Sequence, residues 1–256
     1  MNKIQVKVLN PEAVKEATRM MVATARLTQR GHKIQNLDDF ESYCFGPFTE
    51  ALEENLVSLP HPTIQKLALI NVVVCGASRR FLGQITRHQN EVKFVSGSLQ
   101  YSDYSGSAQF AVPYETILSG KSAIEAYLES CKVQLETYTN LINSGVDHDA
   151  AAYAMPQGMR NILLISATPY QWKHMIGQRV CRRNTAETRI VMLKIWEELY
   201  KLDPIFFSGE TTGPFCCRGK CEEGRMTCGL PIKSRGRDPE DILREDFPLL
   251  FKGGQE

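Results

Sequence analysis

The pattern of hydrophobic and polar positions predicts long helices interleaved with a few strands. Residues 3–10 alternate apolar and polar side chains, which is the period of a half-buried strand. From Pro11 to about Arg26 the apolar residues recur at helical spacing. The residues expected to face the core there are Val14, Ala17, Met21 and Ala25. Residues 38–56 predict a second helix, which ends before the proline-rich stretch at 60–62.

The longest helical pattern covers residues 114–145, where Gly145 is expected to end the helix. The apolar run at 162–165 predicts a core strand, and Pro169 then begins a helix that leads to Arg179. Long helices mixed with a few strands that do not alternate regularly along the chain favour an α+β fold.

Length and charge narrow the class of protein. A chain of 256 residues with a net charge of +1 can bury a substantial core, and its charge does not attract nucleic acid or membrane. No apolar run approaches the roughly 18 residues of a membrane span, and we expect a cytoplasmic protein. We expect residues 1–210 to form the main domain and residues 211–256 a cysteine-containing extension.

Residues 72–102 carry a first group of candidate binding residues. An apolar strand is followed by a Gly-Ala-Ser turn and by a helix bearing Arg79, Gln84, Arg87 and His88. A polar loop then leads to the run Ser98-Leu99-Gln100-Tyr101-Ser102. Such a density of groups that bind anions and rings suggests a nucleotide site, although a solvated surface loop is the alternative.

A second group lies at residues 176–199. If one helix covers this stretch, Arg179, Arg183 and Glu187 share one face, while Arg182 and Arg189 share another. Arg179 stands among apolar residues, where a guanidinium group needs a carboxylate, carbonyl or phosphate partner. We therefore interpret Arg179 as part of a partly enclosed site.

In this order and at these separations, the two stretches resemble the flavin-dependent thymidylate synthase family, the ThyX class. Three segments carry the resemblance: the strand, turn and helix at 72–88, the Ser-x-Gln-Tyr-Ser run at 98–102, and the Arg-x-Cys-x-Arg-x-x-x-Glu-x-Arg pattern at 179–189. The resemblance implies a fold with a mixed or antiparallel sheet and long helices. It also implies a homotetramer whose active sites are built at subunit interfaces.

The resemblance further implies a reaction. In the family, FAD reduced by NADPH relays a one-carbon unit from methylenetetrahydrofolate to C5 of dUMP, which gives dTMP. Carried over to this sequence, the cofactor-binding residues are Arg87, His88, Gln89, Thr63 and His174. The substrate-binding residues are Gln84, Ser98, Leu99, Gln100 and Arg179. Arg179 is also the catalytic candidate, because a fixed cation beside a ring carbonyl stabilises charge that develops during attack at C5.

The sequence departs from the family pattern at binding groups. Gln89 and Gln100 replace two arginines of the signature, and a third family arginine falls on Ala152, which Arg160 would have to replace. A neutral amide donates hydrogen bonds but brings no charge to a phosphate. These losses leave two alternatives open: an enzyme for another pyrimidine nucleotide, or a non-catalytic homologue that binds a nucleotide or a metal.

The C-terminal segment is rich in cysteine. Cys216, Cys217, Cys221 and Cys228 lie within thirteen residues, and four thiolates in a glycine-containing loop are one way to hold zinc. The spacing matches no paired Cys-x-x-Cys pattern, so free or redox-active thiols are the other hypothesis. Charges that alternate between residues 233 and 244 predict a solvated tail, and the apolar residues 247–251 suggest docking on a neighbouring subunit.

Overall fold

An antiparallel sheet organises the molecule. The computed structural model describes residues 4–218, 221–229 and 236–251. Within them the sheet contains β1 (Gln5–Val8), β2 (Ile70–Ser78), β4 (Arg160–Ala167) and β3 (Val92–Ser96), in that spatial order. Every neighbouring pair is antiparallel. The predicted α+β class, the opening strand and the strand at 162–165 are confirmed.

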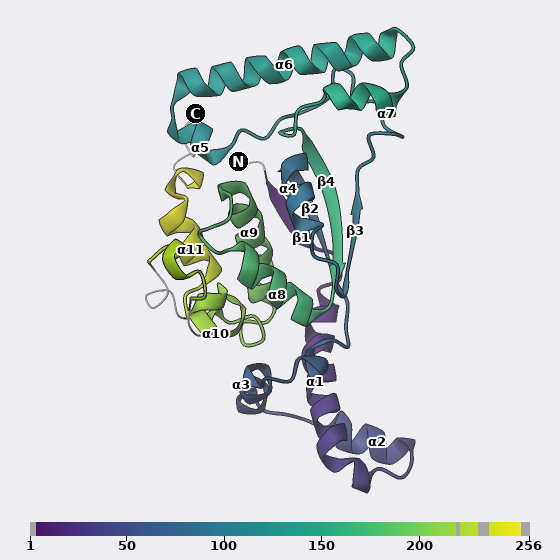
Figure 1. The fold of residues 1–256 in the computed structure, drawn as a ribbon. Helices are drawn as coiled ribbons and strands as arrows, with labels where there is room; N and C mark the ends of the chain where they lie inside the picture. Colours follow the sequence, from purple (N-terminus) through teal and green to yellow (C-terminus); the bar gives the residue numbers. More distant parts are fainter. Residues whose placement is uncertain (1–3, 219–220, 230–235, 252–256) are drawn as a thin grey trace.

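Helices cover one face of the sheet and extend from both of its ends (Figure 1). The helices α8 (Pro169–Arg179) and α9 (Ala186–Leu202) lie against the sheet, α6 (Lys121–Asn143) crosses one end, and α1 (Glu12–Arg30) leads away from the other. The remaining α-helices are α2 (Leu37–Cys44), α3 (Glu50–Ser58), α4 (Arg79–Ile85), α5 (Tyr114–Leu118), α7 (His148–Ala151), α10 (Gly209–Thr212) and α11 (Pro239–Asp246).

The core lies between the sheet and α8 and α9. The side chains at 70, 72 and 74 of β2 are fully buried, and so are those at 163, 165 and 167 of β4. Apart from Ala167 these are valine, leucine and isoleucine, and burying each of those larger side chains contributes about 1.5–3 kcal/mol. Trp172 of α8 is fully buried, and its indole N–H donates to the backbone carbonyl of Ile70 at 3.0 Å. This contact fixes α8 against β2.

Two expected helices are each divided. The prediction of one helix over 38–56 is wrong because Gly46 and Pro47 interrupt the chain between α2 and α3. The prediction of one helix from 114 to 145 is also wrong, since Gly120 separates α5 from α6. Gly120 has a φ of +93°, a conformation that breaks a right-handed helix and that glycine adopts without strain.

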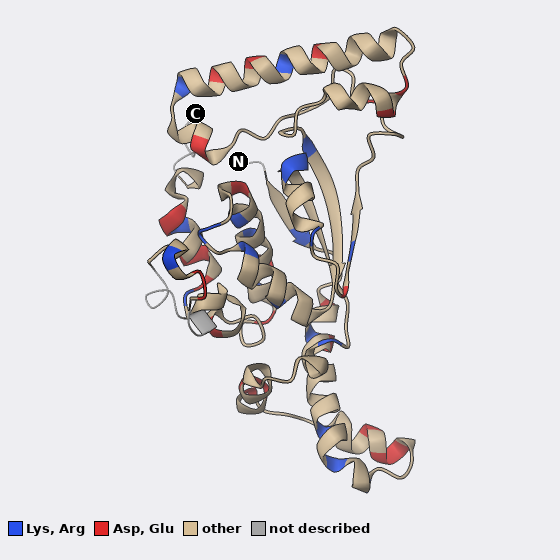
Figure 2. Ribbon diagram, viewed as in Figure 1, with Lys and Arg blue, Asp and Glu red and all other residues tan. Residues whose placement is uncertain are grey.

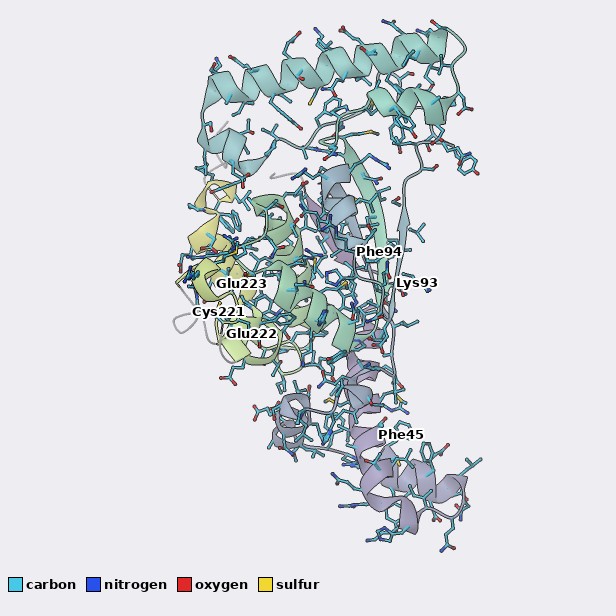
Figure 3. The ribbon with its side chains drawn as sticks, in the orientation of Figure 1. Phe45, Lys93, Phe94, Cys221, Glu222 and Glu223 are labelled. Carbon is cyan, nitrogen blue, oxygen red and sulfur yellow. The ribbon has the colours of Figure 1, made fainter. Side chains whose placement is uncertain are left out.

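The expected polar loop after His88 contains a strand. Residues 92–96 form β3 and pair with β4 from Val92 opposite Ala167 to Ser96 opposite Leu163. Consecutive side chains alternate, so that Lys93 is exposed while Phe94 packs on the core (Figure 3). The pattern was missed because only Val92 and Phe94 face the core.

The C-terminal segment packs on the rest of the chain. Ile242 and Leu243 of α11 are buried against α9, and Phe247 is 2% exposed with its ring 5.1 Å from that of Tyr114. The predictions of a solvated tail over this stretch and of Phe247 on a neighbouring subunit are therefore wrong. Residues 230–235 lie outside the described part. The domain boundary at residue 210 stays a prediction.

Charged groups hold α11 to the body, where blue and red segments meet beside α9 (Figure 2). Asp246 accepts from both Arg182 and Arg189, and Arg182 also pairs with Glu245 at 3.1 Å. Burial opposes ionisation of Asp246, but its bonds to the two arginines prevail and lower its pKa. Among the described helices, none is long and apolar enough to cross a membrane.

Candidate functional site

Arg179 is positioned by the helix that it ends. Thr168 caps the start of α8 by accepting the N–H of Gln171 at 3.2 Å, and Pro169 occupies the first helical position, which needs no N–H donor. Because Trp172 fixes the helix to β2, Arg179 at the end of α8 is held in a defined position beside α4.

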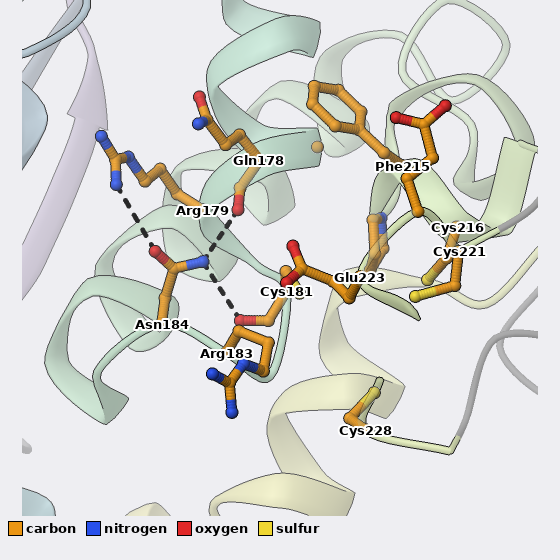
Figure 4. Close-up of a pocket in the computed structure, with 13 residues that line it drawn as sticks. Gln178, Arg179, Cys181, Arg183, Asn184, Phe215, Cys216, Cys221, Glu223 and Cys228 are labelled. Carbon is orange, nitrogen blue, oxygen red and sulfur yellow. Dashed lines mark hydrogen bonds between the residues drawn. The ribbon is translucent and has the colours of Figure 1, made fainter. Parts of the chain in front are cut away.

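The guanidinium group of Arg179 has three partners from two other segments. Its Nε donates to His88 Nε2 at 2.9 Å, and one Nη donates to the backbone carbonyl of Gln84 at 3.0 Å. The other Nη lies 3.5 Å from the side-chain oxygen of Asn184, a contact drawn in Figure 4. Sequence reasoning thus correctly expected polar partners for Arg179, but they are neutral groups.

The expected helix face of Arg179, Arg183 and Glu187 does not exist. Helix α8 ends at Arg179, residues 180–185 form a turn, and α9 starts at Ala186. Glu187 instead accepts the backbone N–H of Ser78 at 2.8 Å. The Asn184 side chain bridges the turn by donating to the carbonyls of Gln178 and Cys181 at 2.8 and 3.3 Å. Its hydrogen bonds replace those that a continuous helix would make.

His88 is held in its neutral form. It lies just past the end of α4, buried, with its ring 5.9 Å from that of His174. Burial, followed by the positive charges of Arg179 and His174, lowers the pKa of His88 to about 4. A neutral imidazole can accept the Arg179 N–H at Nε2, which places its own proton on Nδ1. Burial, and then the charge of Arg87, also lowers the pKa of Arg179.

One cavity lies on the His88 side of Arg179. It has a volume of about 860 Å³, and four expected cofactor residues line it: Arg87, His88, Gln89 and His174. Lys66, Tyr170 and Gln178 complete much of its wall. Lys66 pairs with Glu91 at 2.7 Å, and its ammonium group lies 5.0 Å from the centre of the Tyr170 ring. Cationic and aromatic side chains of this kind suit a ligand with phosphates and rings.

A second cavity, of about 540 Å³, lies on the other side of Arg179. Arg179, Arg183 and Asn184 line it together with Phe215 and several cysteines (Figure 4). Gln178 lines both cavities, so α8 forms the wall between them. Arg179 borders the second cavity while bonding to His88, which lines the first.

Three expected substrate residues lie elsewhere. Ser98, Leu99 and Gln100 follow the edge strand β3 and line neither of these cavities. The Ser98 hydroxyl accepts the backbone N–H groups of Gln100 and Tyr101 at 3.1 and 3.2 Å, which is a local turn. Within one chain the structure therefore does not bring this run to Arg179.

Gln84 lies close to Arg179, whereas Thr63 lies outside both cavities. Gln84 lies on α4 next to Arg179, and its side-chain oxygen accepts from Thr188 and from Thr185 of the α9 start. Thr63 is exposed in a short 3-10 turn (Pro62–Gln65), and it lines neither cavity. Two and three residues further along the chain, Gln65 is buried and Lys66 lines the first cavity.

The family model for the thymidylate synthase complementing protein matches residues 10–205. This match covers most of the chain and contains Arg179 and its partners Gln84, His88 and Asn184. The chain belongs to this family. The resemblance to the flavin-dependent class is thereby confirmed, and the low identities below mark a divergent member.

Individual relatives agree with this assignment. A flavin-dependent thymidylate synthase of Geobacter sulfurreducens is 23% identical over 221 residues, 86% of this chain and 90% of the relative. One from Pyrococcus horikoshii is 28% identical over 203 residues, 72% of this chain and 82% of the relative. Among solved structures, a UMP/dUMP methylase PolB from Streptomyces cacaoi bound with 5-Br dUMP has a similar fold. The TM-score is 0.61 at 15% identity, over 80% of this chain and 93% of that one.

Asn184, Lys66 and Tyr170 border the site of this family member without having been predicted. Asn184 stands where the apolar helical pattern breaks, before the Thr-Ala-Glu that starts α9, and this break was the available signal. Lys66 and Tyr170 come from a turn and from α8, and only the tertiary structure places them beside Arg87.

The cysteines of the C-terminal segment border the same region of this family member. Cys216, Cys221 and Cys228 line the second cavity, whereas the side chain of Cys217 lies outside the described part. Across the described residues, no three His, Cys, Asp or Glu side chains stand ready to hold a metal ion. Cys181, Cys221 and Cys228 are free thiols.

Proposed function

We propose that the protein methylates C5 of dUMP to give dTMP, with FAD as cofactor, methylenetetrahydrofolate as one-carbon donor and NADPH as reductant. The family match supports the reaction, and the relatives named above carry the name of this activity. The structural observation that carries the proposal is the position of Arg179 between two cavities, bonded to a neutral histidine on one side and lining the second cavity on the other.

The first cavity fits a flavin nucleotide. Arg87 and Lys66 offer cations for phosphate oxygens, while Tyr170 and the paired rings of His88 and His174 offer surfaces for stacking. Bound FAD would supply reducing equivalents and relay the one-carbon unit. The protein itself would bind and orient, since no nucleophile is needed.

Arg179 has a distinct role in this proposal. Three neutral partners hold its planar fork without cancelling its charge, which leaves a fixed cation at the cavity wall. A pyrimidine carbonyl placed there would be polarised in the direction that favours bond formation at C5. Water reorganisation would be small because the fork is already positioned.

A protein of similar fold indicates a second candidate substrate. The PolB protein from Streptomyces cacaoi is a UMP/dUMP methylase, so UMP is the alternative to dUMP. The two nucleotides carry the same phosphate, and the replacement of the family's phosphate-binding arginine by Gln100 bears equally on both. Arg183, which lines the second cavity beside Arg179, is a cation available to that phosphate.

Flavin content tests the cofactor assignment. Full-length protein should purify yellow, and Arg87→Ala should lower FAD affinity roughly tenfold or more, because a charge-assisted bond contributes about 1.5–3 kcal/mol. Arg80→Ala is the matched control, since Arg80 is an exposed arginine on α4 that bonds to Gln157 instead. Equal FAD affinity in wild type and Arg87→Ala would remove Arg87 from the site.

The substrate is tested separately with the flavin-loaded protein. Transfer of labelled carbon from methylenetetrahydrofolate to dUMP or to UMP, measured in parallel, identifies the nucleotide. If neither becomes methylated while FAD remains bound, the non-catalytic alternative replaces the proposed reaction.

A further inference from the structure

A third cavity lies on the face of the sheet opposite α8 and α9. Its volume is about 570 Å³, and it shares no lining residue with the two cavities beside Arg179. Its floor crosses three strands, because Gln5 of β1 pairs with Cys75 of β2, and Cys75 pairs with Ile162 of β4. Ile162 is 51% exposed whereas its neighbour Leu163 is buried in the core, which places the cavity on the face away from the helices.

The loop that follows the run at 98–102 forms one wall of this third cavity. Tyr104, Ser107 and Gln109 line the cavity from that loop. The loop is tied to β4, since the backbone N–H of Arg160 donates to the Gln109 carbonyl at 2.7 Å. Hydroxyl and amide groups therefore face the cavity across from the strand that carries Arg160.

The run at 98–102 also begins at this cavity. Gly97, the residue before the run, donates its N–H to the Ile162 carbonyl at 3.0 Å. A Cβ at Gly97 would stand 2.9 Å from the side-chain oxygen of Asn161 and 3.2 Å from the Tyr104 hydroxyl. The run is thus anchored at the cavity wall on both sides.

Arg160 gives the cavity a positive charge that no neighbouring acid neutralises. Among the described residues, its guanidinium group has one hydrogen bond, from an Nη to the neutral side-chain oxygen of Gln109 at 3.1 Å. The described residues that line the cavity include neither Asp nor Glu. Asp103 lies next to Tyr104 in the chain, but it accepts the Ser105 backbone N–H at 2.8 Å and is not a lining residue. A cation held by a neutral partner at a cavity wall suits an anionic ligand.

Two donors at the cavity have no acceptor within the described part of the chain. The Nε of Arg160 and the side-chain nitrogen of Asn161 are buried without a hydrogen-bond partner. The Asn161 oxygen accepts the backbone N–H of Ile162 at 2.8 Å, so only the nitrogen end of this amide is unsatisfied. Buried polar groups are normally paired. Phosphate oxygens in the cavity would accept from both nitrogens after small rotations of these half-buried side chains.

We propose that this third cavity binds the phosphate group of the nucleotide substrate, with Arg160 as its ionic partner and Asn161 as a further donor. The inference rests on the proposed function, because it takes a pyrimidine nucleoside monophosphate as the ligand. A planar guanidinium group can bind two phosphate oxygens together. Arg160 would thus supply the charge that Gln100 and Ala152 do not, and Gln100 lies in the run anchored at this cavity.

The position of the cavity also bears on assembly. The sheet separates it from α8, which carries Arg179 (Figure 1). A nucleotide held here by its phosphate would therefore present its base to the Arg179 of another copy. Phosphate recognition itself needs no reaction, so the test measures binding and not turnover.

Titration calorimetry of the full-length protein with dUMP, UMP, and the corresponding nucleosides tests the proposal. Each nucleoside lacks only the phosphate. Arg160→Gln should weaken nucleotide binding about tenfold or more and leave nucleoside binding unchanged, and inorganic phosphate should compete less well with the nucleotide. Arg160→Lys keeps the charge but loses the planar fork, so it should weaken binding less. Arg80→Gln is the matched control, since Arg80 is an exposed arginine that bonds to the Gln157 side chain.

A second variant keeps the proposal testable if Arg160→Gln does not fold. Asn161→Asp places a negative charge beside the phosphate, and it should also weaken nucleotide binding about tenfold or more while nucleoside binding stays the same. Unchanged nucleotide affinity in folded Arg160 and Asn161 variants would overturn the proposal and leave the proposed function intact. Loss of the preference for nucleotide over nucleoside in Arg183→Gln instead would place the phosphate in the second cavity.

Two further outcomes separate this proposal from its alternatives. If Arg160→Gln changes only the oligomeric state, measured by light scattering, the unpaired donors serve contacts between copies and the proposal fails. Wild-type protein that binds neither nucleotide would overturn both the proposed function and the phosphate site. Nucleotide that binds through Arg160 without becoming methylated would support the phosphate site and remove only the proposed reaction.

Discussion

The two halves of the family signature behave differently in this chain. Gln84 and His88, in the first half, contact Arg179 directly and are separated from it by more than ninety residues of sequence. Ser98 and Gln100, in the second half, make contacts only within their own turn. The first half is built into the core beside α8, whereas the second follows an edge strand.

This difference indicates how the site is divided. One chain brings Arg179 and His88 together beside the cavity proposed for the cofactor, but leaves the run at 98–102 away from the two cavities beside Arg179. We infer that the run completes the site of another copy, in line with the interface sites that the family resemblance implies. Four predictions test this comparison, from the largest expected effect to the smallest.

The largest effect is expected from mixing two inactive variants. Arg179→Ala removes the cation proposed for the pyrimidine carbonyl, and Gln100→Glu places a negative charge where a phosphate would bind. Co-expressed with different tags and purified as mixed assemblies, the two should regain activity from nearly none, because some sites combine intact halves. Arg179→Ala mixed with His88→Ala is the control and should stay inactive. Absence of recovery in the first mixture would show that each chain builds its site alone.

Arg179→Lys should lower kcat/KM for the pyrimidine nucleotide by tenfold to a hundredfold. Lysine keeps the charge but loses the planar fork that bonds to His88 and Gln84 together. Arg182→Lys should change kcat/KM much less, since Arg182 pairs with acidic residues of α11. Steady-state kinetics of both variants decide the matter, and equal kinetics for wild type and Arg179→Lys would remove Arg179 from catalysis.

The neutral state of His88 predicts a pH dependence of stability. Its pKa falls from 6.5 in the unfolded chain to about 4 in the fold, so the unfolded state binds more protons between these values. The free energy of unfolding should therefore decrease as pH falls from about 6.5 to 4, by at most about 3 kcal/mol from this group. Urea titrations should show a shallower dependence in His88→Gln. An unchanged slope would mean that His88 is charged in the fold.

The smallest effect is expected at Asn184. Asn184→Ala removes the bonds to the Gln178 and Cys181 carbonyls and the long contact with Arg179, and each such bond contributes about 0.5–1.5 kcal/mol. We expect kcat to fall a few-fold while the flavin stays bound. Asn184→Asp keeps an acceptor toward Arg179 but loses both donors and adds a negative charge that offsets the Arg179 cation, so it should lower kcat further than Asn184→Ala. If Asn184→Ala has wild-type kcat, the turn is held by its backbone alone.

Local signals were reliable where each element could be defined by its own residues. The apolar run at 72–75 and the proline at 169 correctly predicted a strand in β2 and the start of α8. The Gly-Ala-Ser turn expected at 76–78 was wrong, because these residues continue β2 past a bulge between Cys75 and Ala77. The helix breaks at Gly46 and Gly120 were not predicted, because helical periodicity continues on both sides of each break. β3 was not predicted either, because only some of its residues are buried and its composition is polar.

The sequence by itself determined the family and the α+β class, and it singled out Arg87, His88 and Arg179 as candidates, since these depend on residue types in a fixed order. Tertiary structure decided which of them meet. The His88 imidazole reaches Arg179 only because Trp172 fixes α8 against β2, and Asn184 matters only because the helix ends at Arg179. Contacts between residues far apart in sequence depend on the packing of whole elements, and no local pattern records where those elements meet.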